Sequence, residues 1–299
     1  VEFHTKANAL DADSMALLNS ALSRVEKDGL RGLIVHNDAQ HFSCGVNLQV
    51  VREFFRAEDM DGLDQFLADF QQTVKRMAQA PFPVVAAPVG LSIGGGFEVV
   101  LHARQVICHA NSVTGLVESL VGVVPGGGGC KETLYRWVDQ LGCGEDISDA
   151  CWKAFMNLGY GKTATSPVLA RKQAMLRPND RFVINRDRIL GEAMAAIDDP
   201  SGQAPFERPP LTLPGRPLFE EMVKWLEASR DKGIFFPHDV NVGTEMARIV
   251  TGGDVDPGTQ WSEQDFFDAE RRSFLSLVST DATRERINSM LDAGSPVRN

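Results

Sequence analysis

The sequence has no excess of basic residues, since 30 lysines and arginines stand against 40 aspartates and glutamates and give a formal net charge of −10. Nucleic acids and anionic membrane surfaces are bound mainly by basic patches that displace counterions. A general affinity for either partner is therefore excluded. An anionic small ligand would need local donors of its own.

The sequence also lacks paired cysteines, a leader pattern and a long uninterrupted apolar run. An odd number of cysteines cannot pair fully within one chain, and the absence of any Cys-x-x-Cys favours a reducing, cytoplasmic environment. The five are Cys44, Cys108, Cys130, Cys143 and Cys151. The opening residues show no signal-peptide pattern. Residues 83–103 are apolar but are interrupted by proline, four glycines and Glu98, so we expect no membrane span.

Short apolar runs alternate with amphipathic helical periodicity in the first half of the chain, a pattern typical of an α/β domain. Strands are predicted at 32–36, 83–89 and 105–109. The helix predicted over 59–78 places apolar side chains at helical spacing. They are Leu63, Phe66, Leu67, Phe70 and Val74. Two further helices are expected after the glycines at 94–96 and 126–129.

The composition changes at residues 198–217, which hold six prolines and are predicted to form an extended linker. Residues 1–197 are then one catalytic domain, and residues 218–299 are a helical region. Within that region, Ser262 is the expected N-cap of a helix.

Glu98 lies in the middle of the apolar run, where a charged residue needs a partner or a function. The preceding "GLSIG" has the spacing of a hydrolase nucleophile elbow around Ser92, but the downstream histidines fit a catalytic triad poorly. A dinucleotide fingerprint is weaker still, because the Gly-x-Gly-x-x-Gly spacing is missing. Three glycines that open a helix instead expose backbone N–H groups for an oxyanion. From this segment alone, Glu98 is either a catalytic acid or a stabiliser of its own helix start.

Glu118 is a second acid among apolar residues, and two such carboxyl groups are the usual equipment for general acid and base catalysis. An ion pair with Arg104 or Arg136 is the alternative. The turn "HFSCGVNL" at 41–48 could present the N–H of Val46 toward the same pocket, although by itself it is a common turn.

Together, the three segments resemble the crotonase (enoyl-CoA hydratase/isomerase) superfamily. "HFSCGVNL" is similar to its F-x-x-G-x-D loop, "PVVAAPVGLSIGGGFEVVL" to its P-V-x-A-x-x-G-x-x-x-G-G-G-x-E segment, and "LVESLVGVVPGGGG" to its P-E-x-x-x-G-x-x-P-G-x-G-G segment. Asn47 and Val117 depart from the aspartate and proline of those patterns. The resemblance implies an α/β fold, a crotonase-like spiral of ββα turns followed by a helical C-terminal region, and a possible homo-oligomer.

The resemblance also implies the roles of individual residues. The backbone N–H groups of Val46 and Gly95 would form the oxyanion hole for an acyl-CoA thioester. Glu98 and Glu118 would hold the water that adds to a 2-enoyl-CoA. Further substrate contacts would come from Cys44, Gly45 and Gly94. The implied activity is enoyl-CoA hydratase in fatty-acid β-oxidation. A Δ3,Δ2-enoyl-CoA isomerase and a non-catalytic scaffold of the same fold are the alternatives.

The tail segments "RFVINRDRILGEA", "SEQDFFDAERRSFLSL" and "SPVRN" resemble the C-terminal part of bacterial proteins that fuse a 3-hydroxyacyl-CoA dehydrogenase to a crotonase domain. The chain also begins inside the family's first strand. We therefore expect a fragment whose upstream dehydrogenase part binds NAD, with neither a cofactor nor a metal in the fragment itself.

Overall fold

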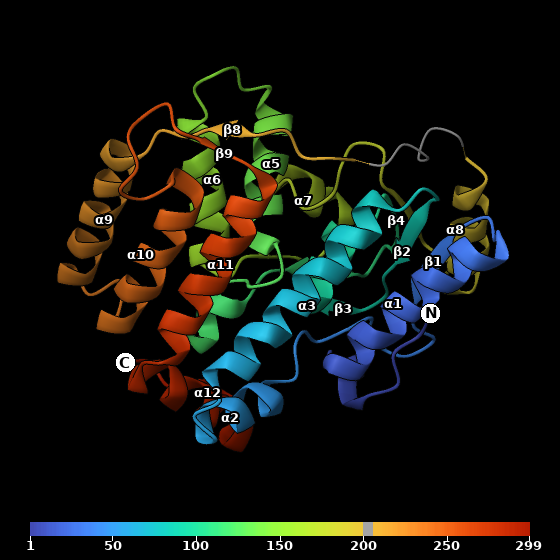
Figure 1. The fold of residues 1–299 in the computed structure, drawn as a ribbon, viewed down its shortest axis with the longest axis horizontal. Helices are drawn as coiled ribbons and strands as arrows, with labels where there is room; N and C mark the ends of the chain where they lie inside the picture. Colours follow the sequence, from blue (N-terminus) through green and yellow to red (C-terminus); the bar gives the residue numbers. More distant parts are fainter. Residues whose placement is uncertain (200–205) are drawn as a thin grey trace. The chain divides into compact units, whose positions relative to one another are not determined.

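The computed structural model describes residues 1–199 and 206–299 (Figure 1). These residues group into two units. The first unit comprises Val1–Asn47, Ala68–Leu116 and Thr163–Glu207, and the second comprises Leu48–Leu67, Val117–Lys162 and Arg208–Asn299. Both units are discontinuous in sequence. The linear division at 198–217 stays a prediction, and residues 200–205 of that linker lie outside the described residues.

The first unit is built on a parallel sheet in the order β1 (Leu33–His36), β2 (Val84–Ala87), β4 (Gln105–His109) and β7 (Arg181–Val183). All four residues of β2 are buried, as expected for a parallel strand covered on both faces. The strands predicted at 32–36, 83–89 and 105–109 are confirmed.

A second sheet of this unit contains β3 (Leu91–Ile93), β5 (Val113–Gly115) and β6 (Thr163–Ala164). Strand β5 pairs in parallel with β3 and antiparallel with β6. Along the chain, β2 and β3 lead into helix α4 (Gly95–Leu101), whereas β4 and β5 lead through the turn η2 (Glu118–Val121) to α5 (Gly129–Leu141). This recurrence of two strands and a helix is the predicted spiral.

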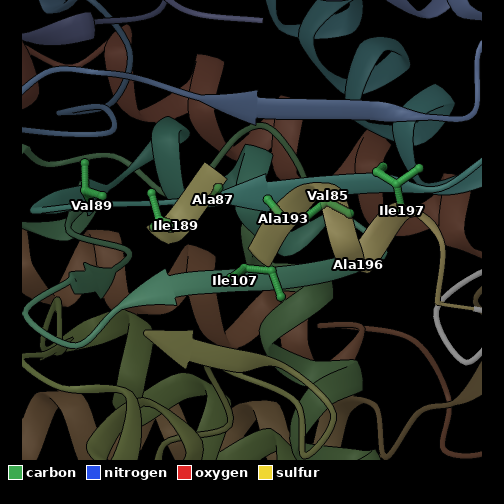
Figure 2. Packing of buried hydrophobic residues seen from close by; sticks show 8 residues of the cluster. All are labelled: Val85, Ala87, Val89, Ile107, Ile189, Ala193, Ala196 and Ile197. Carbon is green, nitrogen blue, oxygen red and sulfur yellow. The ribbon is translucent and has the colours of Figure 1, made fainter. Parts of the chain in front are cut away.

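Helix α8 (Ile189–Ile197) covers one face of the parallel sheet (Figure 2). The buried cluster between them contains Val85, Ala87, Val89, Ile107, Ile189, Ala193, Ala196 and Ile197. The unit also contains η1 (Lys6–Asn8), α1 (Ala12–Asp28), α7 (Pro167–Lys172) and η3 (Arg186–Arg188). This apolar packing fixes α8 against the parallel sheet.

The second unit is mainly helical. Besides η2 and α5 it contains α2 (Leu48–Arg56), the first part of α3 (Met60–Gln79), α6 (Ser148–Gly159), α9 (Arg216–Asp231), α10 (Pro237–Thr251), α11 (Glu263–Val278) and α12 (Asp281–Ala293). The short strands β8 (Leu211–Thr212) and β9 (Gln260–Trp261) pair antiparallel. The predicted helical region is confirmed, although α9 begins two residues before 218 and β9 interrupts the helices.

The Ser262 N-cap is also confirmed, because its hydroxyl accepts a 3.3 Å hydrogen bond from the N–H of Asp265 at the start of α11. Over residues 1–199 and 206–299, no helix is both long enough and apolar enough to cross a membrane.

Candidate active site

The glycine turn between β3 and α4 forms the centre of the candidate site. Gly94 has φ 55° and ψ −138°, a backbone conformation that glycine adopts without a side-chain penalty. Its N–H donates a 3.0 Å hydrogen bond to the carbonyl of Gly115 at the end of β5. The turn is thus anchored to the neighbouring strand at the point where α4 begins.

The loop that contains Val46 runs alongside this turn. Ser43 donates to the carbonyl of Leu91 at 3.0 Å and accepts from the N–H of Ile93 at 3.1 Å, which extends the β3 pairing by one short segment. Gly45 follows with φ 97°. The N–H of Cys44 donates a hydrogen bond to the carbonyl of Ala7. The predicted substrate-contact residues Cys44, Gly45 and Gly94 all lie in the first unit.

Val46 and Gly95 come close together in this unit. A Cβ placed on Gly95 would lie 3.3 Å from the Val46 nitrogen, and one placed on Gly45 would lie 3.4 Å from the Gly95 nitrogen. Among the residues that the structure describes, neither the Val46 nor the Gly95 N–H donates a hydrogen bond to another protein group. The structure therefore brings together two backbone donors, as an oxyanion hole requires.

Glu98 lies in the first turn of α4, three residues after Gly95, and is only 2% exposed. Its own N–H donates to the Gly94 carbonyl at 3.0 Å, and its carbonyl accepts from Nδ1 of His102 at 2.8 Å. The backbone of the acid is thus held on both sides. The first unit therefore contains a buried acid in the first turn of the helix that begins with one of the two donors.

Glu118 belongs to the second unit, where it is half-buried and opens the η2 turn. Val117, in the place of the family proline, precedes it with φ −119° and ψ 11°. The arginines considered as alternative partners have contacts of their own: Arg136 lies 3.8 Å from Glu132, and Arg104 donates to the carbonyl of Ala80. The joint action of Glu118 with Glu98 stays a prediction.

Ser92 does not have the setting of a nucleophile. It lies within β3 instead of at an exposed strand-to-helix turn, and it is completely buried. No hydrogen bond of its Oγ to any other described residue is found. Because a catalytic serine needs an accessible Oγ and a nearby base, the structure does not support the hydrolase interpretation.

Burial affects the titration of the Cys44 thiol in the loop that contains Val46, which is called the donor loop below. Desolvation raises the pKa of the Cys44 thiol, which is half-buried one residue before Gly45. Within the described part of the chain, no group of three or more His, Cys, Asp or Glu side chains is arranged to hold a metal ion.

The sequence did not indicate one group of residues around the η2 turn. Thr283 of α12 contacts the Gly122 carbonyl although the two residues are 161 positions apart, and His238 of α10 contacts Thr283. No local motif marks such a contact, because it is formed only when helices distant in sequence pack together.

Known proteins share the fold of this chain and, in part, its sequence. An enoyl-CoA hydratase of Rhodobacter sphaeroides has the same fold, with a TM-score of 0.67 at 18% identity, over 98% of this chain and 86% of that one. Residues 1–142 match the family described as Enoyl-CoA hydratase/isomerase. This part of the chain, just under half of it, is therefore similar to that family and to the crotonase superfamily.

Two curated relatives are longer than this chain. A probable 3-hydroxyacyl-CoA dehydrogenase of Bacillus subtilis is 32% identical over 301 residues, which cover all of this chain and 38% of that protein. A putative fatty acid oxidation complex trifunctional enzyme of Rickettsia felis is 30% identical over 132 residues, 44% of this chain and 18% of that protein. The chain thus spans well under half the length of either relative.

Proposed function

We propose that the chain is an enoyl-CoA hydratase, which adds water reversibly to a 2-enoyl-CoA and gives a 3-hydroxyacyl-CoA in fatty-acid β-oxidation. The observation that carries the proposal is the pair of neighbouring N–H donors at Val46 and Gly95 with Glu98 in the first turn of the same helix. The match of residues 1–142 to the Enoyl-CoA hydratase/isomerase family supports this interpretation of the arrangement.

The chemistry follows from the charge that develops during hydration. The oxygen of water bonds to C3, the C2=C3 π bond breaks, and C2 takes up a proton. Negative charge meanwhile develops on the thioester oxygen, where the two N–H groups would stabilise it; one such donor typically contributes a factor of about 10²–10³ in rate.

Hydration requires two proton transfers, one from the attacking water and one to C2. Glu98 would take a proton from the attacking water, and Glu118 would donate one to C2, after which exchange with solvent restores both carboxyl groups. A positioned acid or base contributes about 10²–10⁴-fold. The role of Glu118 rests on its place in the "LVESLVGVVPGGGG" motif. The presence of both acids favours hydration over isomerisation, which can proceed with a single acid.

Hydration of crotonyl-CoA, followed by the loss of its conjugated enoyl absorbance, tests the proposal. We expect Glu98→Gln and Glu118→Gln each to lower kcat by about 10²-fold or more, because each removes a proton-transfer group. Glu227→Gln, on the exposed side of α9, is the matched control and should keep the wild-type rate. Undiminished hydration in both active-site variants would refute the assignment.

We further propose that the chain is part of a longer cytoplasmic polypeptide whose upstream part is an NAD-dependent 3-hydroxyacyl-CoA dehydrogenase. The Bacillus subtilis relative, of which this chain covers 38%, supports this proposal by its name. The hydration step itself uses only protein groups and water, so it calls for no cofactor in this chain. The full-length protein should form NADH from crotonyl-CoA and NAD, whereas this chain alone should form only the hydroxyacyl product.

A further inference from the structure

We propose that Thr283 is a positioning residue for Glu118, acting through the carbonyl of Gly122 at the end of the η2 turn. This inference rests on the proposed function, because it assumes that Glu118 is the proton donor. Every contact used below lies within the second unit.

Thr283 of α12 forms a hydrogen bond with the η2 turn. Its side chain is completely buried, and its hydroxyl donates a 2.7 Å hydrogen bond to the Gly122 carbonyl. Gly122 has φ 85°, and a Cβ placed there would lie 3.0 Å from the threonine Oγ1. The helix and the turn therefore approach as closely as a bare glycine allows.

The turn transmits this contact to Glu118. The N–H of Gly122 donates to the carbonyl of Ser119 at 3.1 Å, and the N–H of Val123 donates to the carbonyl of Glu118 at 3.2 Å. A shift of Gly122 would therefore move the backbone from which the acid projects.

His238 orients the threonine hydroxyl. The hydroxyl has one proton, which goes to Gly122, so its oxygen accepts a hydrogen bond from Nε2 of His238 at 2.8 Å. The other ring nitrogen, Nδ1, then accepts from the amide of Asn241 at 3.4 Å. The neutral imidazole protonated on Nε2 satisfies every member of this chain of hydrogen bonds.

Arg286 supports the same turn one helical turn further along α12. Its Nη1 donates to the carbonyl of Ser119 at 3.4 Å, while its Nη2 forms a 2.8 Å ion pair with Asp239 of α10. The side chain of Arg286 is 2% exposed. Two side chains of one helix thus hold two carbonyls of the turn that begins with Glu118.

Part of the turn borders open space. Ser119 and Leu120 line a cavity of about 410 Å³ together with Arg286 and Asp239, and Leu120 remains 42% exposed. The side chain of Leu120 therefore contributes little apolar packing to the turn. The polar contacts from α12 decide where Glu118 lies.

Catalysis is sensitive to such placement, since a shift of about 1 Å in a reacting group can cost about 10²-fold in rate. We expect Thr283→Val, which preserves shape but removes the hydroxyl, to lower kcat for crotonyl-CoA hydration by about 10- to 100-fold. KM should change by less than about 3-fold, because the thioester oxygen is bound by other groups. The pH–rate profile should also shift, because the acid is displaced.

Matched variants separate positioning from stability. Thr251→Val removes a hydroxyl that is equally buried and bonded to the Ala247 carbonyl within α10, so it should lower stability but leave kcat of the folded enzyme unchanged. Thr283→Ser should restore most of the lost rate. If Thr283→Val does not fold, Thr283→Ala removes the same hydroxyl with less steric demand and carries the same expectation.

The outcomes are distinct for the two proposals. A wild-type kcat and pH profile in folded Thr283→Val or Thr283→Ala, with Glu118→Gln inactive, would overturn the positioning role and leave the proposed function intact. Full hydration by Glu118→Gln would overturn the positioning role, and only if Glu98→Gln also hydrates at the full rate would the proposed function fall with it. A kcat loss in the Thr283 variants, recovered in Thr283→Ser and absent in Thr251→Val, would establish the positioning role.

Discussion

Gly95 and Val46 approach so closely that a Cβ on Gly95 would lie 2.8 Å from the Cγ2 of Val46 and 3.3 Å from its nitrogen. A side chain at residue 95 would therefore press on the loop that presents the second donor. The glycine is required here by this close approach, because only a residue without Cβ leaves both N–H groups accessible.

Replacing Gly95 by alanine should consequently impair the candidate oxyanion hole. We expect Gly95→Ala to lower kcat/KM for crotonyl-CoA hydration by about 10²–10³-fold, the usual effect of losing one oxyanion donor. Steady-state kinetics on the folded variant measure this. Gly191→Ala in α8 is the control, because its Cβ would meet no atom within 4 Å. It should retain activity and gain about 0.5–1 kcal/mol in stability. Wild-type kinetics in Gly95→Ala would contradict the role of this glycine.

Cys44 offers a chemical probe of the donor loop. Desolvation raises the pKa of its thiol, so less thiolate is present near neutral pH and alkylation by iodoacetamide should be slower than that of free cysteine. Saturating crotonyl-CoA should slow the labelling further, because the proposed substrate covers the loop. Peptide mass spectrometry measures both rates. Cys143, half-buried in the second unit, is the control whose labelling should not respond to substrate. Equal Cys44 labelling with and without substrate would argue against the site.

Lys131 of α5 is a fully buried cation held between two carboxylates. Its Nζ lies 2.8 Å from Glu132 and 2.7 Å from Glu263. Lys131→Met would leave these acids without the lysine, so we expect the free energy of unfolding to fall by about 3–5 kcal/mol. Chemical denaturation measures the change. Lys27→Met, at an exposed position of α1, should alter stability by no more than about 0.5 kcal/mol. A loss below about 1 kcal/mol for Lys131→Met would show that the buried charges can rearrange.

His238 should make stability depend on pH. Its pKa is lowered, first by desolvation and then by Arg286 of α12, whereas Asp239 on its own helix opposes the shift. Below the ordinary histidine pKa of about 6.5, the unfolded chain binds this proton more readily than the folded chain. The stabilisation is therefore complete above about pH 6.5 and is lost as the pH falls. Denaturation of the wild type and of His238→Gln across pH 5–8 measures this, and parallel curves would show that another group is responsible.

Much of the local structure could be predicted from the sequence. The strand at 83–89 is a continuous apolar run, and the helix at 59–78 repeats apolar residues at helical spacing, so burial dictates both. The cap at Ser262 depends on residues three positions apart and was equally predictable. The sequence did not predict elements that depend on partners far away in the chain. The two-residue strand β9, for example, exists only because it pairs with β8.

The sequence by itself determined the longer strands and helices, the glycines that open α4, and the presence of Glu98 and Glu118 in family motifs. Tertiary structure alone decided that the Val46 loop lies beside Gly95, and that Thr283 reaches Gly122 across 161 positions. The physical reason is the range of the forces involved. Periodicity and caps are set by neighbours in sequence, whereas close backbone approach and buried hydrogen bonds form only when distant segments are packed together.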